Sequence, residues 1–136
     1  MGLFRKKKHK LPSFPKTIKK TFKEYCVNVS LDKIDRLKEK VLEQIEEAKE
    51  RAGQGRLSDV QLAKEISERC LYLLDHYEDF SPREQKLITG AVCYFAISDD
   101  PISEEIFACG YDDDAQVVNY VLEELKIDNM YILIAD

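Results

Sequence analysis

The chain of 136 residues is long enough for one domain with a buried core, and its 44% hydrophobic and 35% charged composition argues against a disordered chain. Its longest apolar runs, Ala91–Ile97 and Met130–Ala135, are far shorter than the roughly 20 residues that span a bilayer. The basic N-terminus is not followed by a hydrophobic segment. We therefore expect a cytoplasmic protein with neither a secretory signal nor a membrane-spanning helix.

Charge is distributed unevenly along the chain. Residues 1–24 contain nine basic residues and one acid, whereas the other 112 residues contain 12 basic and 25 acidic residues, within a net charge of −5. A basic segment is thus attached to an acidic body. We predict that residues 1–15 are a flexible arm, mobile over residues 1–12, and that residues 16–136 form a single helical domain.

The predicted elements after the arm are all helical. A short basic amphipathic helix is expected at residues 16–25, where Ile18, Phe22 and Tyr25 recur at helical spacing. The first long helix has Ser30 as its N-cap and an apolar stripe that starts at Leu31. The main helices are predicted at residues 31–52, 59–77, 82–97 and 114–126.

The second and third main helices have recognisable starts. Ser58 begins a plausible capping box, and the run from Ser81 to Glu84 combines an N-cap, a proline at the first helical position and a glutamate at the third. From Leu87 to Ile97 the third helix is apolar on nearly every side, which predicts a central core helix. Gly90 inside it predicts that another helix passes close by.

The fold expected from this pattern is all-α, a small bundle of four main helices plus short turns. The last main helix is expected to open at Asp112 or Asp113. The apolar stretch Met130–Ala135 fits a strand, a helix end or a docked extension equally well. The residues predicted to form the core are Leu73, Leu87, Ile88, Val92, Phe95, Val118, Val121 and Leu122.

The stretch DPISEEIFACGYDDDA, residues 100–115, resembles the signature of the YkvA-like domains of unknown function, S-P-x-D-x-I-P-D-x-I-P-x-x-G-x-x-D-D-A. Glu104 replaces an aspartate of that pattern, and Glu105 an apolar residue. The resemblance covers Leu87 to Leu125 and implies a helical hairpin whose loop carries acids, often near a membrane, with no established reaction. The matching residues are Asp100, Ile102, Ile106, Gly110, Asp113, Asp114 and Ala115, and Ser98, Ser103 and Phe107 stand where the family has prolines.

The acids of this loop have two interpretations. Short carboxylates at helix starts act as caps and meet the positive end of the helix dipole, so Asp100, Asp113 and Asp114 are expected to be structural. Gly110 is expected to be structural as well, as the residue at which the preceding turn ends. The alternative is a divalent-metal site, or a metal-dependent hydrolase, that uses Asp100, Glu104, Asp113 and Asp114. Their spacing is not that of an EF-hand loop. We favour the structural interpretation and expect no cofactor.

The cysteines and histidines do not indicate catalysis or a zinc site. Cys26, Cys70, Cys93 and Cys109 form no C-x-x-C pair, and we expect them to be buried structural thiols. His76 lies among acids at a helix end and is expected to be solvated. The most favoured function is therefore a non-catalytic interaction or scaffold domain with an unidentified protein partner.

The basic segment has three interpretations. In the first it is a solvated tail or folds back on the acidic body. In the second it binds an anionic membrane surface, and Leu3, Phe4, Phe14 and Phe22 dip into the interface. In the third it binds nucleic acid. Nucleic acid is unfavoured because the acidic body would repel phosphates and no RNA-stacking motif is present. The residues that would contact an anionic surface are Arg5, Lys6, Lys7, Lys8, Lys10, Lys19, Lys20 and Lys23.

Overall fold

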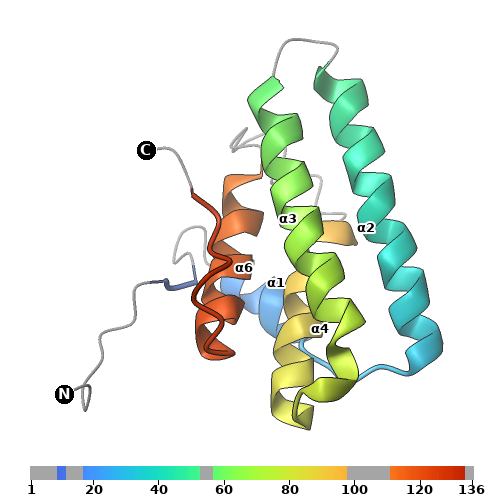
Figure 1. Cartoon of the computed structure of the whole chain (residues 1–136), viewed down its shortest axis with the longest axis vertical. Helices are drawn as coiled ribbons and strands as arrows, with labels where there is room; N and C mark the ends of the chain where they lie inside the picture. Colours follow the sequence, from blue (N-terminus) through green and yellow to red (C-terminus); the bar gives the residue numbers. More distant parts are fainter. Residues whose placement is uncertain (1–8, 12–16, 53–56, 98–110, 134–136) are drawn as a thin grey trace.

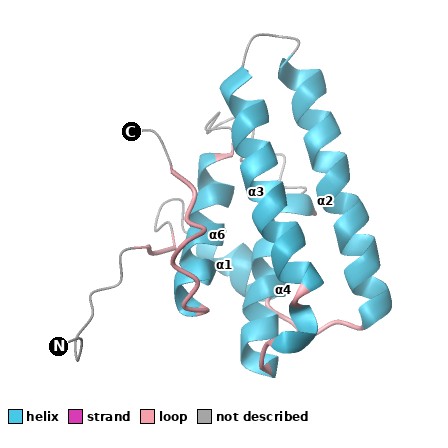
Figure 2. Cartoon of the chain, viewed as in Figure 1, coloured by secondary structure: helices cyan, strands magenta, loops and turns pink. Residues whose placement is uncertain are grey.

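The computed structural model of the chain describes residues 9–11, 17–52, 57–97 and 111–133, and every regular element within these ranges is helical (Figure 2). The prediction of an all-α bundle is confirmed, and the expected short basic helix is present at Thr17–Tyr25 beside the four main ones. The elements are α1 (Thr17–Tyr25), α2 (Leu31–Ala52), α3 (Leu57–Asp75), the 3-10 turn η1 (Tyr77–Asp79), α4 (Pro82–Ala96) and α6 (Asp112–Glu124).

Helix α4 lies at the centre of the bundle. It packs against α1, α2, α3 and α6, while α2 and α3 form a long antiparallel pair along one side (Figure 1). Every residue of α4 from Ile88 to Ala96 is buried. A helix that is apolar all round is stable in water only when other elements enclose it. The prediction of a central core helix is therefore confirmed.

Two predicted helix starts are observed as hydrogen bonds. Ser81 and Glu84 form a reciprocal capping box before Pro82: the Glu84 amide donates to the Ser81 hydroxyl at 3.3 Å, and the Ser81 amide donates to the Glu84 carboxylate at 2.9 Å. The second bond holds the pKa of Glu84 below its ordinary value. At α2 the Lys33 amide donates to the Ser30 hydroxyl at 3.4 Å. Each bond satisfies an amide that the helix itself leaves unpaired.

The second main helix differs from its prediction at both ends. α3 begins at Leu57, so Ser58 lies inside its first turn and does not precede it. α3 ends at Asp75, and the chain then turns through η1. The Tyr77 carbonyl accepts a hydrogen bond at 2.9 Å from the side chain of Gln85 on α4. Tyr77 is buried as its helical spacing suggested, but this tertiary contact holds it in a 3-10 turn.

The predicted core is confirmed at seven of its eight positions. The exception is Leu87, which is only partly buried because the enclosure of α4 begins one residue later, at Ile88. Leu31, which was expected in the apolar stripe of α2, is 56% exposed because it stands at the first position of its helix. The confirmed residues are Leu73, Ile88, Val92, Phe95, Val118, Val121 and Leu122.

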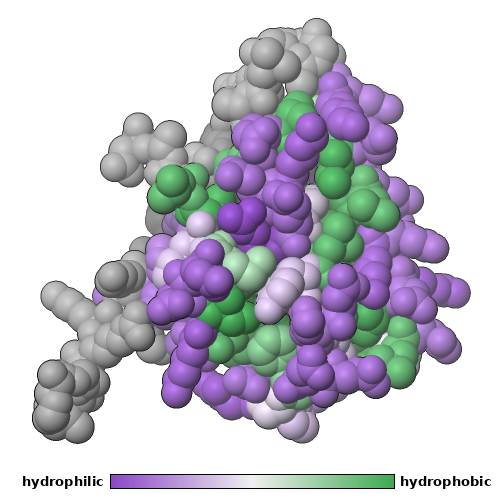
Figure 3. All heavy atoms as spheres, viewed as in Figure 1, coloured by the Kyte–Doolittle hydropathy of each residue, from purple (hydrophilic) through white to green (hydrophobic). Residues whose placement is uncertain are grey.

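The outward side of α2 is almost entirely charged. Lys40 and Glu43 form an ion pair at 3.5 Å, and Lys49 and Glu46 one at 3.6 Å. Figure 3 shows hydrophilic residues over much of the face that α2 and α3 present, with hydrophobic residues between them. Leu42, at 51% exposure, is one of the apolar interruptions. This surface accounts for part of the acidic body that the sequence predicts.

Gly90 is the point at which α1 reaches the central helix. A Cβ atom added at Gly90 would lie 2.5 Å from the Cys26 sulfur and 2.8 Å from a ring carbon of Phe22. Both distances are shorter than van der Waals contact, so no side chain fits there without displacing its neighbours. The prediction that a helix passes close to Gly90 is confirmed, and that helix is α1.

We expect Gly90→Ala to destabilise the fold although alanine is the better helix former. Overpacking costs about 1–3 kcal/mol, which exceeds the gain of at most about 1 kcal/mol in helix propensity. Chemical denaturation measures the difference. The double variant Cys26→Ala/Gly90→Ala removes the nearest obstructing atom and should recover part of the loss. A Gly90→Ala protein as stable as the wild type would contradict the close approach.

Candidate functional site

The exposed lysines of α1 are the part of the predicted basic surface that the structure describes best. Lys19, Lys20 and Lys23 are all exposed, and their spacing places them on one side of the helix; we call them the lysine face. Lys10, which precedes the helix, is exposed as well. The remaining basic residues of the prediction, Arg5, Lys6, Lys7 and Lys8, lie outside the described residues.

The apolar side of α1 is committed to the core. Ile18 is 4% and Phe22 is 2% exposed, and the Phe22 ring meets Tyr120 of α6 edge-on with 5.9 Å between ring centroids. The expectation that Phe22 dips into a membrane interface is therefore wrong, because its ring is enclosed between α1, α4 and α6. Within the described ranges, no helix is long and apolar enough to cross a membrane.

The segment that precedes α1 contacts the body at residues 9–11. The His9 amide donates to the Glu123 carboxylate at 2.8 Å, and the His9 ring lies against Tyr131 with 4.1 Å between centroids. Leu11 packs against the core. His9 thus has partners on α6 and on the C-terminal segment, and the predicted mobility of residues 1–12 stays a prediction.

The acidic loop of the prediction is described only at its end. Asp100, Glu104 and Gly110 lie outside the described residues. α6 begins at Asp112, as expected, and Asp113 and Asp114 stand half-buried in its first turn. The N-cap residue is Tyr111, whose side chain makes no capping hydrogen bond. Asp113 is thus the second residue of the helix, where a carboxylate favours the positive end of the helix dipole.

The metal alternative receives no support from the part of the chain that is described. There, no three His, Cys, Asp or Glu side chains come together in a way that could hold a metal ion. Of the four acids proposed as ligands, only Asp113 and Asp114 fall in this part. The structural interpretation of Asp100 and Gly110 likewise stays a prediction.

The described cysteines are packed within or beside the core. Cys70 and Cys93 are buried as expected, whereas Cys26 is only half-buried, and Cys109 lies outside the described residues. Burial raises the pKa of Cys26 and of Cys93 to about 11, and raises that of Cys70 further. A thiol must ionise to act as a nucleophile. These three are therefore poor nucleophiles at neutral pH.

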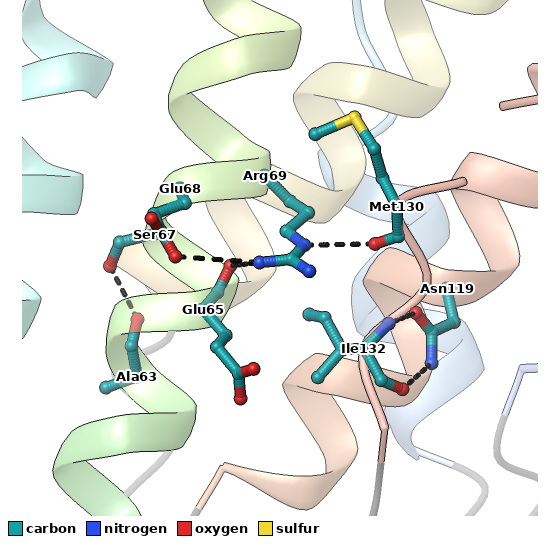
Figure 4. Close-up of polar contacts among 8 residues, drawn as sticks. All are labelled: Ala63, Glu65, Ser67, Glu68, Arg69, Asn119, Met130 and Ile132. Carbon is teal, nitrogen blue, oxygen red and sulfur yellow. Dashed lines mark hydrogen bonds and ion pairs between the residues drawn. The ribbon is translucent and has the colours of Figure 1, made fainter. Parts of the chain in front are cut away.

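The C-terminal segment, residues 128–133, is a docked extension, which settles one of the three possibilities for this stretch over its described part. It lies beside α6 and α3 and has no regular secondary structure (Figure 4). Asn119, only 1% exposed, bonds both backbone groups of Ile132: its amide nitrogen donates to the carbonyl at 2.9 Å, and its oxygen accepts from the N–H at 2.7 Å. Arg69 of α3 donates to the Met130 carbonyl at 2.9 Å. We call residues 128–133 the tail, and Arg69 with Asn119 the tail site.

The reversal that directs the tail back along α6 is built around Lys126. This residue has φ of 62° at the end of the helix. The Lys126 amide donates to the Glu123 carbonyl at 3.0 Å, and the Ile127 amide donates to the Leu122 carbonyl at 2.9 Å. These two bonds define a Schellman motif, which satisfies the last carbonyls of a helix and usually has glycine at the left-handed position. A lysine at that position is strained.

Sequence analysis missed the residues of the tail site. The signal available was Asn119 itself, a polar residue next to the apolar positions Val117, Val118, Val121 and Leu122 of one helix. A buried amide needs partners, and none is available within its own helix ladder. Its partner lies 13 positions along the chain, beyond the reach of helical periodicity.

We expect Lys126→Gly to stabilise the protein by about 0.5–1 kcal/mol, because glycine adopts a positive φ without a Cβ penalty. Lys126→Ala is the matched control: it removes the charge but keeps the Cβ atom, and should give no gain. Urea denaturation of both variants measures the difference. Equal stability changes in the two variants would mean that the backbone at Lys126 carries no strain.

We expect Asp113→Ala to lower stability by about 0.3–1 kcal/mol, through loss of a charge at the helix start, to the same extent with and without Mg²⁺ or Ca²⁺. Thermal melts at millimolar metal test this, with Asp128→Ala, an exposed acid beyond the helix, as the control. A bound ion would raise the melting temperature of the wild type. A rise that Asp113→Ala abolishes would support the metal alternative.

Comparison of the chain with protein-family models, with curated proteins and with solved structures finds no match. The resemblance of Leu87–Leu125 to the YkvA-like domains stays a prediction.

Proposed function

We propose that this protein is a non-catalytic interaction or scaffold domain that binds an anionic membrane surface through the lysine face and the basic segment before it. The observation that carries the proposal is the orientation of α1. Ile18 and Phe22 anchor the helix in the core, and Lys19, Lys20 and Lys23 on its other side are exposed to solvent. A helix that inserted into lipid would instead need its apolar side free.

The proposed attraction is electrostatic. Each lysine close to an anionic leaflet contributes about 1 kcal/mol, and this contribution falls off within a Debye length, about 8 Å at physiological salt. Binding of this kind is weakened by salt and depends on the fraction of anionic lipid. The cytoplasmic leaflets of cell membranes carry such lipids, which fits the expected cytoplasmic location.

The charge of the acidic body would orient the protein on the membrane. Residues 25–136 contain 12 basic and 25 acidic residues, and the exposed charges of α2 belong to this part of the chain. An anionic surface repels this part and attracts the basic end. The domain would then stand with α1 toward the membrane, leaving α2 and α3 accessible to a protein partner. Nucleic acid, also a polyanion, is the competing ligand that an experiment has to separate.

We expect the triple charge reversal Lys19→Glu/Lys20→Glu/Lys23→Glu to weaken binding to vesicles of phosphatidylserine and phosphatidylcholine by about 100-fold or more, from about 1 kcal/mol for each lysine. Vesicle sedimentation at two salt concentrations measures this. The matched control reverses three exposed lysines of α2 and α3, with the same change in net charge. It should change binding far less. The control residues are Lys40, Lys49 and Lys64.

Two results would contradict the proposal. The first is an equal loss in the control variant, which would show that only net charge matters. The second is a wild-type protein that ignores anionic vesicles while binding single- or double-stranded nucleic acid of the same charge concentration. That outcome would show that the partner of the lysine face is nucleic acid and not a membrane.

A further inference from the structure

The tail is recognised mainly through its backbone. Asn119 bonds both the N–H and the C=O of Ile132, and Arg69 bonds the carbonyl of Met130. A pair of bonds to both backbone groups of one residue is the pattern by which an adjacent β-strand holds its neighbour. The tail site thus provides a fragment of strand-like recognition on a helical scaffold (Figure 4).

Side chains of the tail add a single buried aliphatic anchor. Ile132 is 3% exposed, whereas the adjacent Leu133 is 91% exposed. Tyr131 lies against the His9 ring. Ile132 faces the protein and Leu133 faces solvent, as successive side chains of a strand do, while Met130 and Tyr131 are partly buried against the core. Peptides that bind by strand addition are recognised in the same way, through the main chain and alternate side chains.

Helix α6 does not depend on the tail for its own termination. The bonds from the Lys126 and Ile127 amides close its C-terminal turn before the tail begins. The tail can therefore leave without removing a hydrogen bond from the end of the helix. Departure would, however, cost the buried amide of Asn119 both of its bonds to Ile132. Because a buried amide needs hydrogen-bond partners, Asn119 favours binding of another peptide segment that offers the same backbone N–H and C=O groups.

We propose that the tail is an exchangeable internal occupant of a peptide-binding site. The external ligand is an extended segment of a partner protein that carries an aliphatic residue with free backbone N–H and C=O groups at the position of Ile132. The tail is covalently attached and competes at high effective concentration, so the site is autoinhibited. His9, which bonds Glu123 of α6 and lies against Tyr131, also holds the tail in the site. This proposal is independent of membrane binding, which involves the lysine face.

The test compares two variants of the whole 136-residue chain in which the same charge is placed at adjacent positions. Ile132→Asp places a charge at the buried anchor and should release the tail, whereas Leu133→Asp places the same charge on the exposed neighbour. The probe is a fluorescein-labelled peptide with the sequence of residues 128–136, DNMYILIAD, titrated with each protein and followed by fluorescence anisotropy. A second peptide, with Asp at the position of Ile132, is the specificity control.

We expect Ile132→Asp to bind the peptide at least tenfold more tightly than the wild type does, because its own tail no longer competes. Leu133→Asp should bind like the wild type, and the control peptide should not bind. Adding Asn119→Ala to Ile132→Asp should weaken binding at least tenfold. Equal affinity of wild type and Ile132→Asp, absence of binding in both, or an equal effect of Leu133→Asp would overturn the proposal.

Two further measurements keep the test decisive. Hydrogen exchange of the wild-type protein should show the Ile132 amide exchanging at least 100-fold faster than the Val92 amide in α4, because the tail opens locally. Equal protection of the two amides would overturn the proposal even if Ile132→Asp does not fold. Light scattering measures whether the wild-type protein forms a dimer. A wild-type dimer that Ile132→Asp abolishes would overturn the proposal, because the tail would then exchange between two copies of this chain and not with a partner protein.

Discussion

The contact of α1 with α4 at Gly90 is the constraint on which the basic end of the molecule depends. Because Gly90 has no side chain, Phe22 and Cys26 can lie directly against the backbone of the central helix. The apolar side of α1 is buried in that contact, and the lysine face, together with Glu24, is exposed to solvent. This packing feature of the core removes Phe22 from any contact with a membrane, and the membrane contact that we propose for α1 therefore depends on its lysines.

Buried polar groups show which connections are local and which are tertiary. Within the described residues, Ser67, Thr89 and Asn119 are the buried polar residues. The hydroxyls of Ser67 and Thr89 each donate to a carbonyl four residues earlier in their own helix, Ala63 and Gln85. Asn119 cannot be satisfied in this way, since its amide offers a donor and an acceptor that point away from the helix. It therefore ties the tail to α6.

Residues 9–11 and the tail meet on α6. The His9 amide bonds Glu123 and its ring lies against Tyr131, and the tail site holds Met130 and Ile132. Glu123 stands in the last turn of α6, where a carboxylate is unfavourable next to the negative end of the helix dipole, so a hydrogen-bond donor there is stabilising. The basic segment and the tail are consequently physically connected, although their proposed ligands differ.

The sequence by itself determined the features that depend on neighbouring residues. Helical periodicity, the capping box of Ser81 and Glu84, and the wholly apolar α4 identify the bundle and its central helix, because caps and amphipathic stripes act over three or four residues. The enclosure of Phe22, the turn at Tyr77 and the docking of the tail were decided by tertiary structure. Each depends on a partner distant in sequence: Gly90, Gln85 and Asn119. A stripe of apolar residues specifies that a face is buried, but only the packed fold specifies what buries it.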